Sequence, residues 1–302
     1  MTAIATEGLT KRFGAIVAVD GLDLTVERGE VFGFLGPNGS GKTTTIRLVL
    51  DLARPTAGTA TVLGRDSRAD AIEIHRRIGY LPGELDLPKD LTASAYLDFV
   101  AALRPTADPA WRAELCERFD VSLDRRMGEL STGSKQKVGL VQAFMHRPEL
   151  VFLDEPTRGL DPLVQREFHD LLAESRDRAT TVFLSSHTLS QVERVADRVG
   201  ILRDGRLVVT DTLEQLRSRA RRELELDYET APQSPDALDA LPGVVSVRTR
   251  GTTVLVSVDG PVDEVLRAAL ELGTVANVRT PEADLEEIFL DYYRSRREDE
   301  RP

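Results

Sequence analysis

A glycine-rich stretch carries the residue types that hold phosphate groups. It fits the pattern Gly-x-x-x-x-Gly-Lys-Thr at every position, after an apolar run at 31–35 and before a helical stretch at 44–52. Its glycines let the backbone wrap phosphate oxygens, and the helix start adds N–H groups. We expect Lys42 to face the β- and γ-phosphates and the Thr43 hydroxyl to bind Mg²⁺. The residues predicted to cradle a nucleoside triphosphate are Gly36, Pro37, Asn38, Gly39, Ser40, Gly41, Lys42, Thr43 and Thr44.

A second set of reactive side chains follows an apolar run at 150–153. Asp154 and Glu155 come directly after it, so a buried strand would deliver both carboxylates to its carboxyl end. In open α/β sheets this edge faces the bound ligand. Asp154 is expected to hold Mg²⁺, directly or through water, and Glu155 to act as general base on the attacking water. Acidic residues at the end of a strand are common in α/β proteins, so this prediction depends on the glycine-rich loop earlier in the chain.

Four further segments lie in a fixed order around these two motifs. Residues 130–136 read Leu-Ser-Thr-Gly-Ser-Lys-Gln before an amphipathic stretch, and residues 159–161 read Gly-Leu-Asp. His187 follows a third apolar run, and Phe13 lies in a Lys-Arg-Phe-Gly segment. Taken singly, the histidine suits a cap or core position, the phenylalanine a core position and the serines an ordinary helix start. Their order and spacing favour a common function.

In this order the segments resemble the ATP-binding cassette (ABC) ATPases, from residue 1 to about residue 215. The resemblance identifies 130–136 with the signature sequence, usually written LSGGQ, and His187 with the switch histidine. It implies that Phe13 stacks on adenine and that Asp161 belongs to the D-loop. The cofactors implied are ATP and Mg²⁺.

The resemblance also implies a dimer of two copies of the chain that close head to tail with ATP between them. Ser131 and Gly133 of one copy would contact the γ-phosphate held by the loop of the other. A serine hydroxyl and a glycine N–H at a helix start are suitable donors to an anion. His187 would hydrogen-bond the same phosphate and help to hold the attacking water. Hydrolysis would then weaken the contact and open the dimer.

Two positions depart from the family pattern. The signature reads Ser-Thr-Gly-Ser in place of Ser-Gly-Gly-Gln, and Gly83 occupies the place of the Q-loop glutamine. Glu84, the next residue, either replaces that glutamine at Mg²⁺ through water or leaves the contact missing. These variants, together with a C-terminal extension, resemble cassettes of bacterial efflux pumps for antibiotics and other drugs. The resemblance therefore favours export.

The elements that must position these groups alternate between apolar runs and helical patterns. This alternation predicts an α/β domain over residues 1–216, interrupted by a helical insertion at about 92–145. By resemblance it is a P-loop NTPase fold with an N-terminal antiparallel β subdomain. After a basic run, residues 222–302 read as a small α+β ferredoxin-like domain in β-α-β-β-α-β order. Its predicted elements are strands 223–228, 244–248, 252–258 and 275–280, helices 234–241 and 262–272, and a final helix at 284–294.

Composition excludes several classes of protein. The 302 residues carry a net charge of −11, which argues against nucleic acid as a general partner. No apolar run approaches the about 20 residues of a membrane span, so a transporter role requires a separate multi-span permease. We expect a peripheral protein on the cytoplasmic face of the cell membrane. Cys116 is the only cysteine, which excludes an intrachain disulfide.

Two other functions compete with this interpretation. The first is a soluble ABC ATPase that acts on the ribosome or on nucleic acid, although such proteins usually carry two cassettes or a long coiled-coil insertion. The second is a P-loop kinase or GTPase, but the chain lacks the guanine-specifying Asn-Lys-x-Asp. That class would also leave the signature-like segment and His187 without a function.

Overall fold

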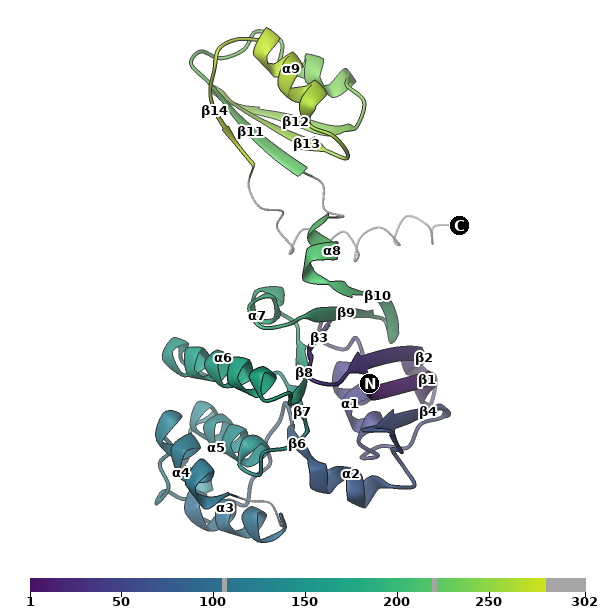
Figure 1. Cartoon of the computed structure of the whole chain (residues 1–302), viewed down its shortest axis with the longest axis vertical. Coiled ribbons are helices and arrows are strands. Elements are labelled where there is room, and N and C mark those ends of the chain that lie inside the picture. The colour runs from purple at the N-terminus through teal and green to yellow at the C-terminus, as the bar shows by residue number, and fades with distance from the viewer. Residues whose placement is uncertain (105–107, 219–221, 281–302) are drawn as a thin grey trace. The chain divides into compact units, whose positions relative to one another are not determined.

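The computed structural model describes residues 1–104, 108–218 and 222–280, and it divides into two compact units, Met1–Leu213 and Glu214–Pro302 (Figure 1). The sequence predicted a boundary a few residues later, after residue 216. That the two units are separate domains stays a prediction. The predicted final helix at 284–294 lies outside the described residues.

The first unit is built on a six-stranded sheet whose strands are parallel except for the edge strand β10. Every residue of β3, β7 and β8 is buried, as expected for parallel strands covered on both faces. These three strands are the apolar runs predicted from the sequence. In sheet order the strands are β10 (Arg206–Thr212), β9 (Arg198–Arg203), β3 (Val31–Leu35), β8 (Thr181–Ser186), β7 (Leu150–Asp154) and β6 (Ile78–Leu81).

A second, antiparallel sheet forms the N-terminal part of this unit, as the resemblance implied. Its core is shared with the central sheet, because residues of both sheets and of α1 belong to one buried cluster. At the centre of that cluster the Phe183 ring lies 5.2–5.8 Å from the rings of three other phenylalanines. In sheet order the strands are β2 (Ile16–Glu27), β1 (Thr2–Phe13), β4 (Ala57–Val62) and β5 (Arg65–Asp66).

Helices occupy the region where the helical insertion was predicted, and Figure 1 shows them gathered on the side of the central sheet away from β1 and β2. They are α3 (Ala93–Ala102), α4 (Pro109–Arg118), the 3-10 turn η1 (Met127–Glu129) and α5 (Thr132–Phe144). The other helices of the unit are α1 (Lys42–Val49), α2 (Ala71–Arg77), α6 (Pro162–Asp177) and α7 (Leu189–Glu193), and α8 (Leu213–Ser218) follows β10. Within the described ranges, none of the helices has the length and apolar character to cross a membrane.

The second unit has the predicted ferredoxin-like arrangement of strands. All neighbouring strands are antiparallel, and Tyr228 Oη donates to Ala269 O at 3.0 Å, which ties α9 to the sheet. One prediction was wrong: the segment expected to be a helix at 234–241 is a short 3-10 turn, η2 (Pro235–Ala240). In sheet order the strands are β12 (Val244–Arg250), β13 (Thr253–Val258), β11 (Arg222–Tyr228) and β14 (Val275–Arg279), with α9 at Asp263–Glu271.

Candidate nucleotide-binding site

The glycine-rich loop joins the carboxyl end of β3 to the start of α1, where the sequence placed it. Gly41 is left-handed (φ 109°), and a Cβ there would lie 2.3 Å from Ala18 O. A Cβ on Gly36 would likewise lie 2.5 Å from Leu202 O. Only glycine fits both positions, so the loop can lie tightly between β2 and β9 with its backbone turned to a ligand.

Lys42 lies folded over its own loop. Its Nζ donates to Gly36 O at 2.6 Å and to Pro37 O at 3.2 Å, and lies 3.6 Å from Glu155 Oε1. Burial lowers the pKa of Lys42, while the charges of Glu155 and Asp154 oppose that shift. The ammonium is therefore held beside two carboxylates, in a position where a phosphate could compete for it.

Asp154 is buried and anchored on both of its oxygens. Thr43 Oγ1 donates to Oδ2 at 2.6 Å, and Ser185 Oγ donates to Oδ1 at 2.5 Å. Asp154 and Ser185 are register partners at the carboxyl ends of the parallel strands β7 and β8. The three side chains thus form a rigid oxygen-rich group at the mouth of the glycine-rich loop.

Glu155 departs from regular strand geometry directly after β7. Its φ of 50° is left-handed, a conformation that costs a non-glycine residue about 1–2 kcal/mol. Its N–H donates to Ser185 O at 3.1 Å, which fixes the turn. Its Oε2 lies 2.7 Å from His187 Nδ1, so the carboxylate bridges the histidine and Lys42.

A cavity of about 390 Å³ opens beside these groups. Glu84 lines it, as does Gly83 in the place of the Q-loop glutamine. A Cβ on Gly83 would lie 3.1 Å from Asp154 Oδ2, so a side chain there requires that carboxylate to shift. Glu84 is exposed, one residue further along. The other lining residues are Ala18, Asn38, Gly39, Gly41, Lys42, Thr43, Thr44, Arg47, Asp154, Glu155 and Arg158.

The signature-like segment caps α5 and packs against the loop that follows Glu155. Ser131 is the N-cap, and its Oγ accepts from Ser134 N at 3.2 Å. A Cβ on Gly133 would lie 2.3 Å from Gly159 O, so the two loops touch through glycine backbone. The buried Gln136 donates its Nε2 to Pro156 O at 3.0 Å. Signature and D-loop therefore form one packed unit within this chain.

Not all the predicted site residues line the cavity. Phe13 is 54% exposed at the end of β1, with Lys11 Nζ 4.9 Å from its ring centroid. Asp161 caps α6, accepting from two backbone N–H groups at 3.0 Å, and these bonds lower its pKa. Absent from the lining are Phe13, Gly36, Pro37, Ser40, Ser131, Gly133, Asp161 and His187. The contact of Ser131 and Gly133 with a triphosphate stays a prediction.

Sequence reasoning missed three residues of the site. Ser185 anchors Asp154, while Arg47 and Arg158 add positive charge to the cavity wall. A signal for Ser185 existed, because it is a polar residue at the end of an apolar run, beside another such end. Arg47 and Arg158 gave none, since a helical arginine and a loop arginine are ordinary surface residues.

Comparison with known proteins gives one consistent result. The family described as "ABC transporter" matches residues 19–158. A bacitracin transport ATP-binding protein of Bacillus licheniformis is 38% identical over 227 residues, which covers 74% of each chain. A daunorubicin/doxorubicin resistance ATP-binding protein of Streptomyces peucetius is 34% identical over 302 residues, covering 95% of this chain and 91% of that protein.

Solved structures agree in fold. An ATP-binding subunit of an ABC transporter superposes with a TM-score of 0.67 at 29% identity, covering 72% of this chain and 92% of the other. A dimeric ATP-binding cassette bound to ADP and Pi gives a TM-score of 0.64 at 22% identity over 70% of this chain and 98% of the other. At 22% identity, the similarity to this second structure shows a common fold and nothing more.

Proposed function

This chain belongs to the ABC transporter family of ATP-binding proteins and is an ATPase, and from that premise we propose that it powers export through a separate membrane permease. Export is proposed from the relatives, whereas ATP hydrolysis, the source of its energy, is supported by the arrangement of Lys42, Glu155 and His187. A carboxylate lies 3.6 Å from the phosphate-binding lysine and 2.7 Å from a histidine, at one edge of the parallel sheet.

ATP binding is assigned to the glycine-rich loop and α1. The triphosphate would accept hydrogen bonds from the loop N–H groups and draw the Lys42 ammonium away from Gly36 O and Pro37 O. The bonds from Lys42 to a charged phosphate offset the loss of its bonds to the two backbone carbonyls, because hydrogen bonds between ionised groups are about twice as strong as neutral ones. Phe13, exposed at the end of β1, is the proposed platform for adenine.

The same edge suits Mg²⁺. Thr43 and Asp154 present hard oxygen donors, with Thr43 Oγ1 and Asp154 Oδ2 only 2.6 Å apart. Among the residues that the structure describes, no group of three or more His, Cys, Asp or Glu side chains is placed to hold a metal ion. Magnesium commonly takes one or two protein oxygens and completes its shell with phosphates and water, so the set fits. We assign Thr43 and Asp154 as ligands and Glu84 as a partner through water; the ion would neutralise charge on the phosphates.

Hydrolysis is assigned to Glu155 and His187. Glu155 would take a proton from water as the water oxygen bonds the γ-phosphorus and the bond to the β-phosphate oxygen breaks, giving ADP and phosphate. Lys42 would stabilise the charge on the transferring group. His187 Nδ1 is hydrogen-bonded to Glu155, which leaves Nε2 of the exposed ring to donate to a γ-phosphate.

The proposed working unit is a head-to-tail dimer of this chain. Ser131 and Gly133 stand at the start of α5 and outside the cavity that holds Lys42, and a second copy would bring them to the phosphate. The contact of Gly133 with Gly159 would connect ATP-driven closure directly to the loop that follows Glu155. Export of a drug or antibiotic is inferred from the names of the relatives. A chain that powers a separate permease would lie at the membrane as a peripheral subunit, on its cytoplasmic face.

Cysteine crosslinking tests the dimer. With Cys116→Ser as background, Asn38→Cys and Thr132→Cys in one chain should form a disulfide-linked dimer with ATP when Glu155→Gln blocks turnover. Each single-cysteine variant is the matched control and should give much less of this product. Equal yields with and without ATP would contradict the nucleotide sandwich while leaving the ATPase assignment intact.

Co-purification tests the permease. Leu91 and Phe99 are exposed apolar residues beside and on α3, where a membrane subunit is expected to dock. The double change Leu91→Asp and Phe99→Asp should abolish co-purification with a multi-span membrane protein, whereas Leu163→Asp on α6, also exposed, should not. Undiminished co-purification of the double variant removes this docking surface from the proposal.

A further inference from the structure

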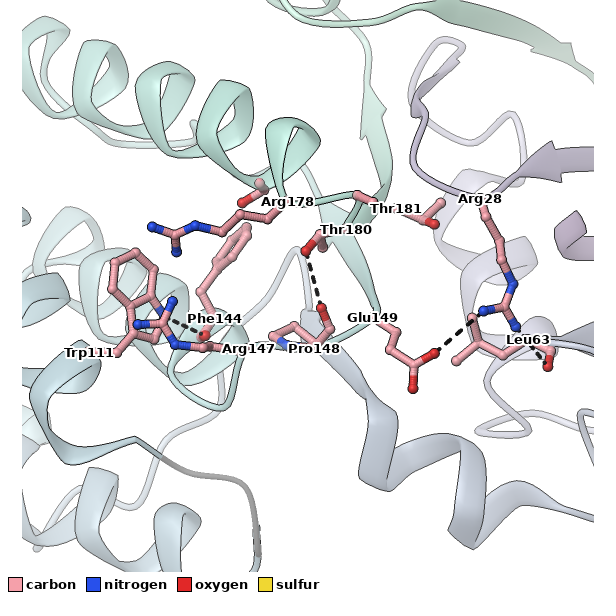
Figure 2. Close-up of a pocket in the computed structure, with 12 residues that line it drawn as sticks. Arg28, Leu63, Trp111, Phe144, Arg147, Pro148, Glu149, Arg178, Thr180 and Thr181 are labelled. Carbon is pink, nitrogen blue, oxygen red and sulfur yellow. Dashed lines mark hydrogen bonds and ion pairs between the residues drawn. The ribbon is translucent and has the colours of Figure 1, made fainter. Parts of the chain in front are cut away.

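A second hollow lies at the opposite edge of the central sheet from the nucleotide cavity. It has a volume of about 300 Å³ and is lined by residues that precede β3, β7 and β8, whereas the nucleotide groups follow β3 and β7 (Figure 2). The five residues of β7 separate the amino and carboxyl ends of the strands by about 17 Å, at about 3.3 Å per residue. A ligand in this hollow would therefore not compete with ATP for space.

Three arginines from different elements face this space, which we call the arginine hollow: Arg28 before β3, Arg147 after α5 and Arg178 at the end of α6. The buried indole of Trp111 positions two of them. The Arg147 and Arg178 guanidinium carbons lie 4.5 Å and 5.0 Å from its ring centroid, and Trp111 Nε1 donates to Phe144 O at 3.0 Å. Figure 2 shows both guanidinium groups beside the indole.

The arginines that line the hollow outnumber its carboxylates. Glu149 is its one lining carboxylate, and a bidentate pair with Arg77, at 2.6 and 2.7 Å, already engages it. Arg28 shares it at 3.6 Å, and Arg147 pairs with Asp108 at 3.2 Å. Among the described residues, no carboxylate lies within ion-pair distance of Arg178. Positive charge thus collects here on a chain whose net charge is −11.

The remaining wall is apolar. Leu63, Phe144 and Pro148 line the hollow, and the hydroxyl of Thr180 lies 3.4 Å from Pro148 O. The volume is at the small end of the range for ligand pockets. Guanidinium groups beside an apolar wall suit a ligand with both a charged head and an apolar body.

We propose that the arginine hollow binds a small organic anion, namely a carboxylate, sulfonate or phosphate group on an aromatic or apolar body. The charged group lies against Arg147 and Arg178, and the body lies against Phe144 and Pro148. The site is separate from the nucleotide cavity, so nucleotide and anion bind together.

Fluorescence gives a direct test, because Trp111 is the only tryptophan of the chain. The probe is 1-anilinonaphthalene-8-sulfonate, an aromatic sulfonate, added to the full chain at saturating MgADP. Its affinity is read from emission sensitised by Trp111. Arg178→Gln should weaken binding about tenfold or more, the loss expected for a charge-assisted hydrogen bond. The control Arg267→Gln, on the exposed surface of α9, should keep the wild-type affinity.

Two further measurements make the outcome decisive. Thr180→Tyr fills the hollow without changing its charge. It should lower the affinity for the dye as much as Arg178→Gln does, so the test does not depend on one arginine variant. Inorganic phosphate lacks an aromatic or apolar body, so it should displace the dye only at a concentration much higher than that of the dye. Three outcomes would each overturn the proposal. They are wild-type affinity in both Arg178→Gln and Thr180→Tyr, a dye affinity that is much weaker at saturating MgADP than without nucleotide, and phosphate binding as tight as that of the dye.

Discussion

His187 Nδ1 lies 2.7 Å from Glu155 Oε2, although the two residues stand at the ends of different strands. The contact exists because β7 and β8 are parallel neighbours, with Asp154 opposite Ser185. Glu155 then turns into a left-handed conformation, held by the bond from its N–H to Ser185 O. The carboxylate therefore has a fixed direction, as a general base requires.

Replacement of Glu155 by glutamine should separate binding from turnover. Glutamine keeps the size of the side chain but cannot accept the proton of the attacking water. Phosphate release should fall by about 10²–10⁴-fold, while ATP binding persists and closed dimers accumulate on size exclusion. The control Glu73→Gln, at an exposed ion pair on α2, should retain wild-type turnover. Near-normal phosphate release in Glu155→Gln would show that another group is the base.

Gly133→Ala should disturb the contact between signature and D-loop. The new Cβ would lie 2.3 Å from Gly159 O, so one loop must move. Overpacking of this kind costs about 1–3 kcal/mol, and a displacement of about 1 Å at an active site can lower turnover about 100-fold. Urea unfolding and steady-state ATPase rates measure the two effects. Gly128→Ala is the matched control, because its Cβ would meet Lys89 O at 3.2 Å. Equal rates in the two variants would contradict this coupling.

Glu84→Gln tests the departure in the Q-loop. If the Glu84 carboxylate supports Mg²⁺ through water, its neutralisation should raise the Mg²⁺ concentration for half-maximal ATPase activity about tenfold or more. Asp86→Asn removes the same charge two residues away and outside the cavity lining, so it should leave that concentration unchanged. If both variants respond to Mg²⁺ like the wild type, Glu84 has no part in the metal site.

His146 makes the fold sensitive to acid. It is buried, its Nε2 lies 2.9 Å from Ile78 O, and burial with the nearby Arg104 charge lowers its pKa to about 4. Since its unfolded pKa is about 6.5, the unfolded chain binds the proton more tightly. This contribution to stability is complete above pH 6.5 and is lost as the pH falls towards 4.

The expected loss between pH 7 and pH 5 is about 2 kcal/mol of unfolding free energy from this group alone. His146→Gln keeps a donor for Ile78 O but does not titrate, so urea unfolding should show a drop smaller by about that amount. His75→Gln leaves His146 in place and should keep the wild-type drop. An unchanged drop in His146→Gln would assign the acid sensitivity to other groups.

The residue types of the site and their order along the chain could be predicted from the amino-acid sequence. The loop at 36–43, the two acids at the end of β7 and the three buried strands could all be predicted, because each depends on neighbours within a few residues. The type of helix formed by the segment at 235–240 could not be predicted. Six residues that begin with Pro235 fold as a 3-10 turn, since so short a segment gains too few hydrogen bonds for its local pattern to select the α form.

Which distant residues meet could be seen only once the chain had folded. Ser185 reaches Asp154 across 31 positions of sequence, and Gly133 touches Gly159 across two loops. Arg28, Arg147 and Arg178 converge on one hollow, although in sequence each looks like a solvated surface residue. Sheet order and register set these contacts. Both depend on long-range packing, which a local pattern of residue types does not encode.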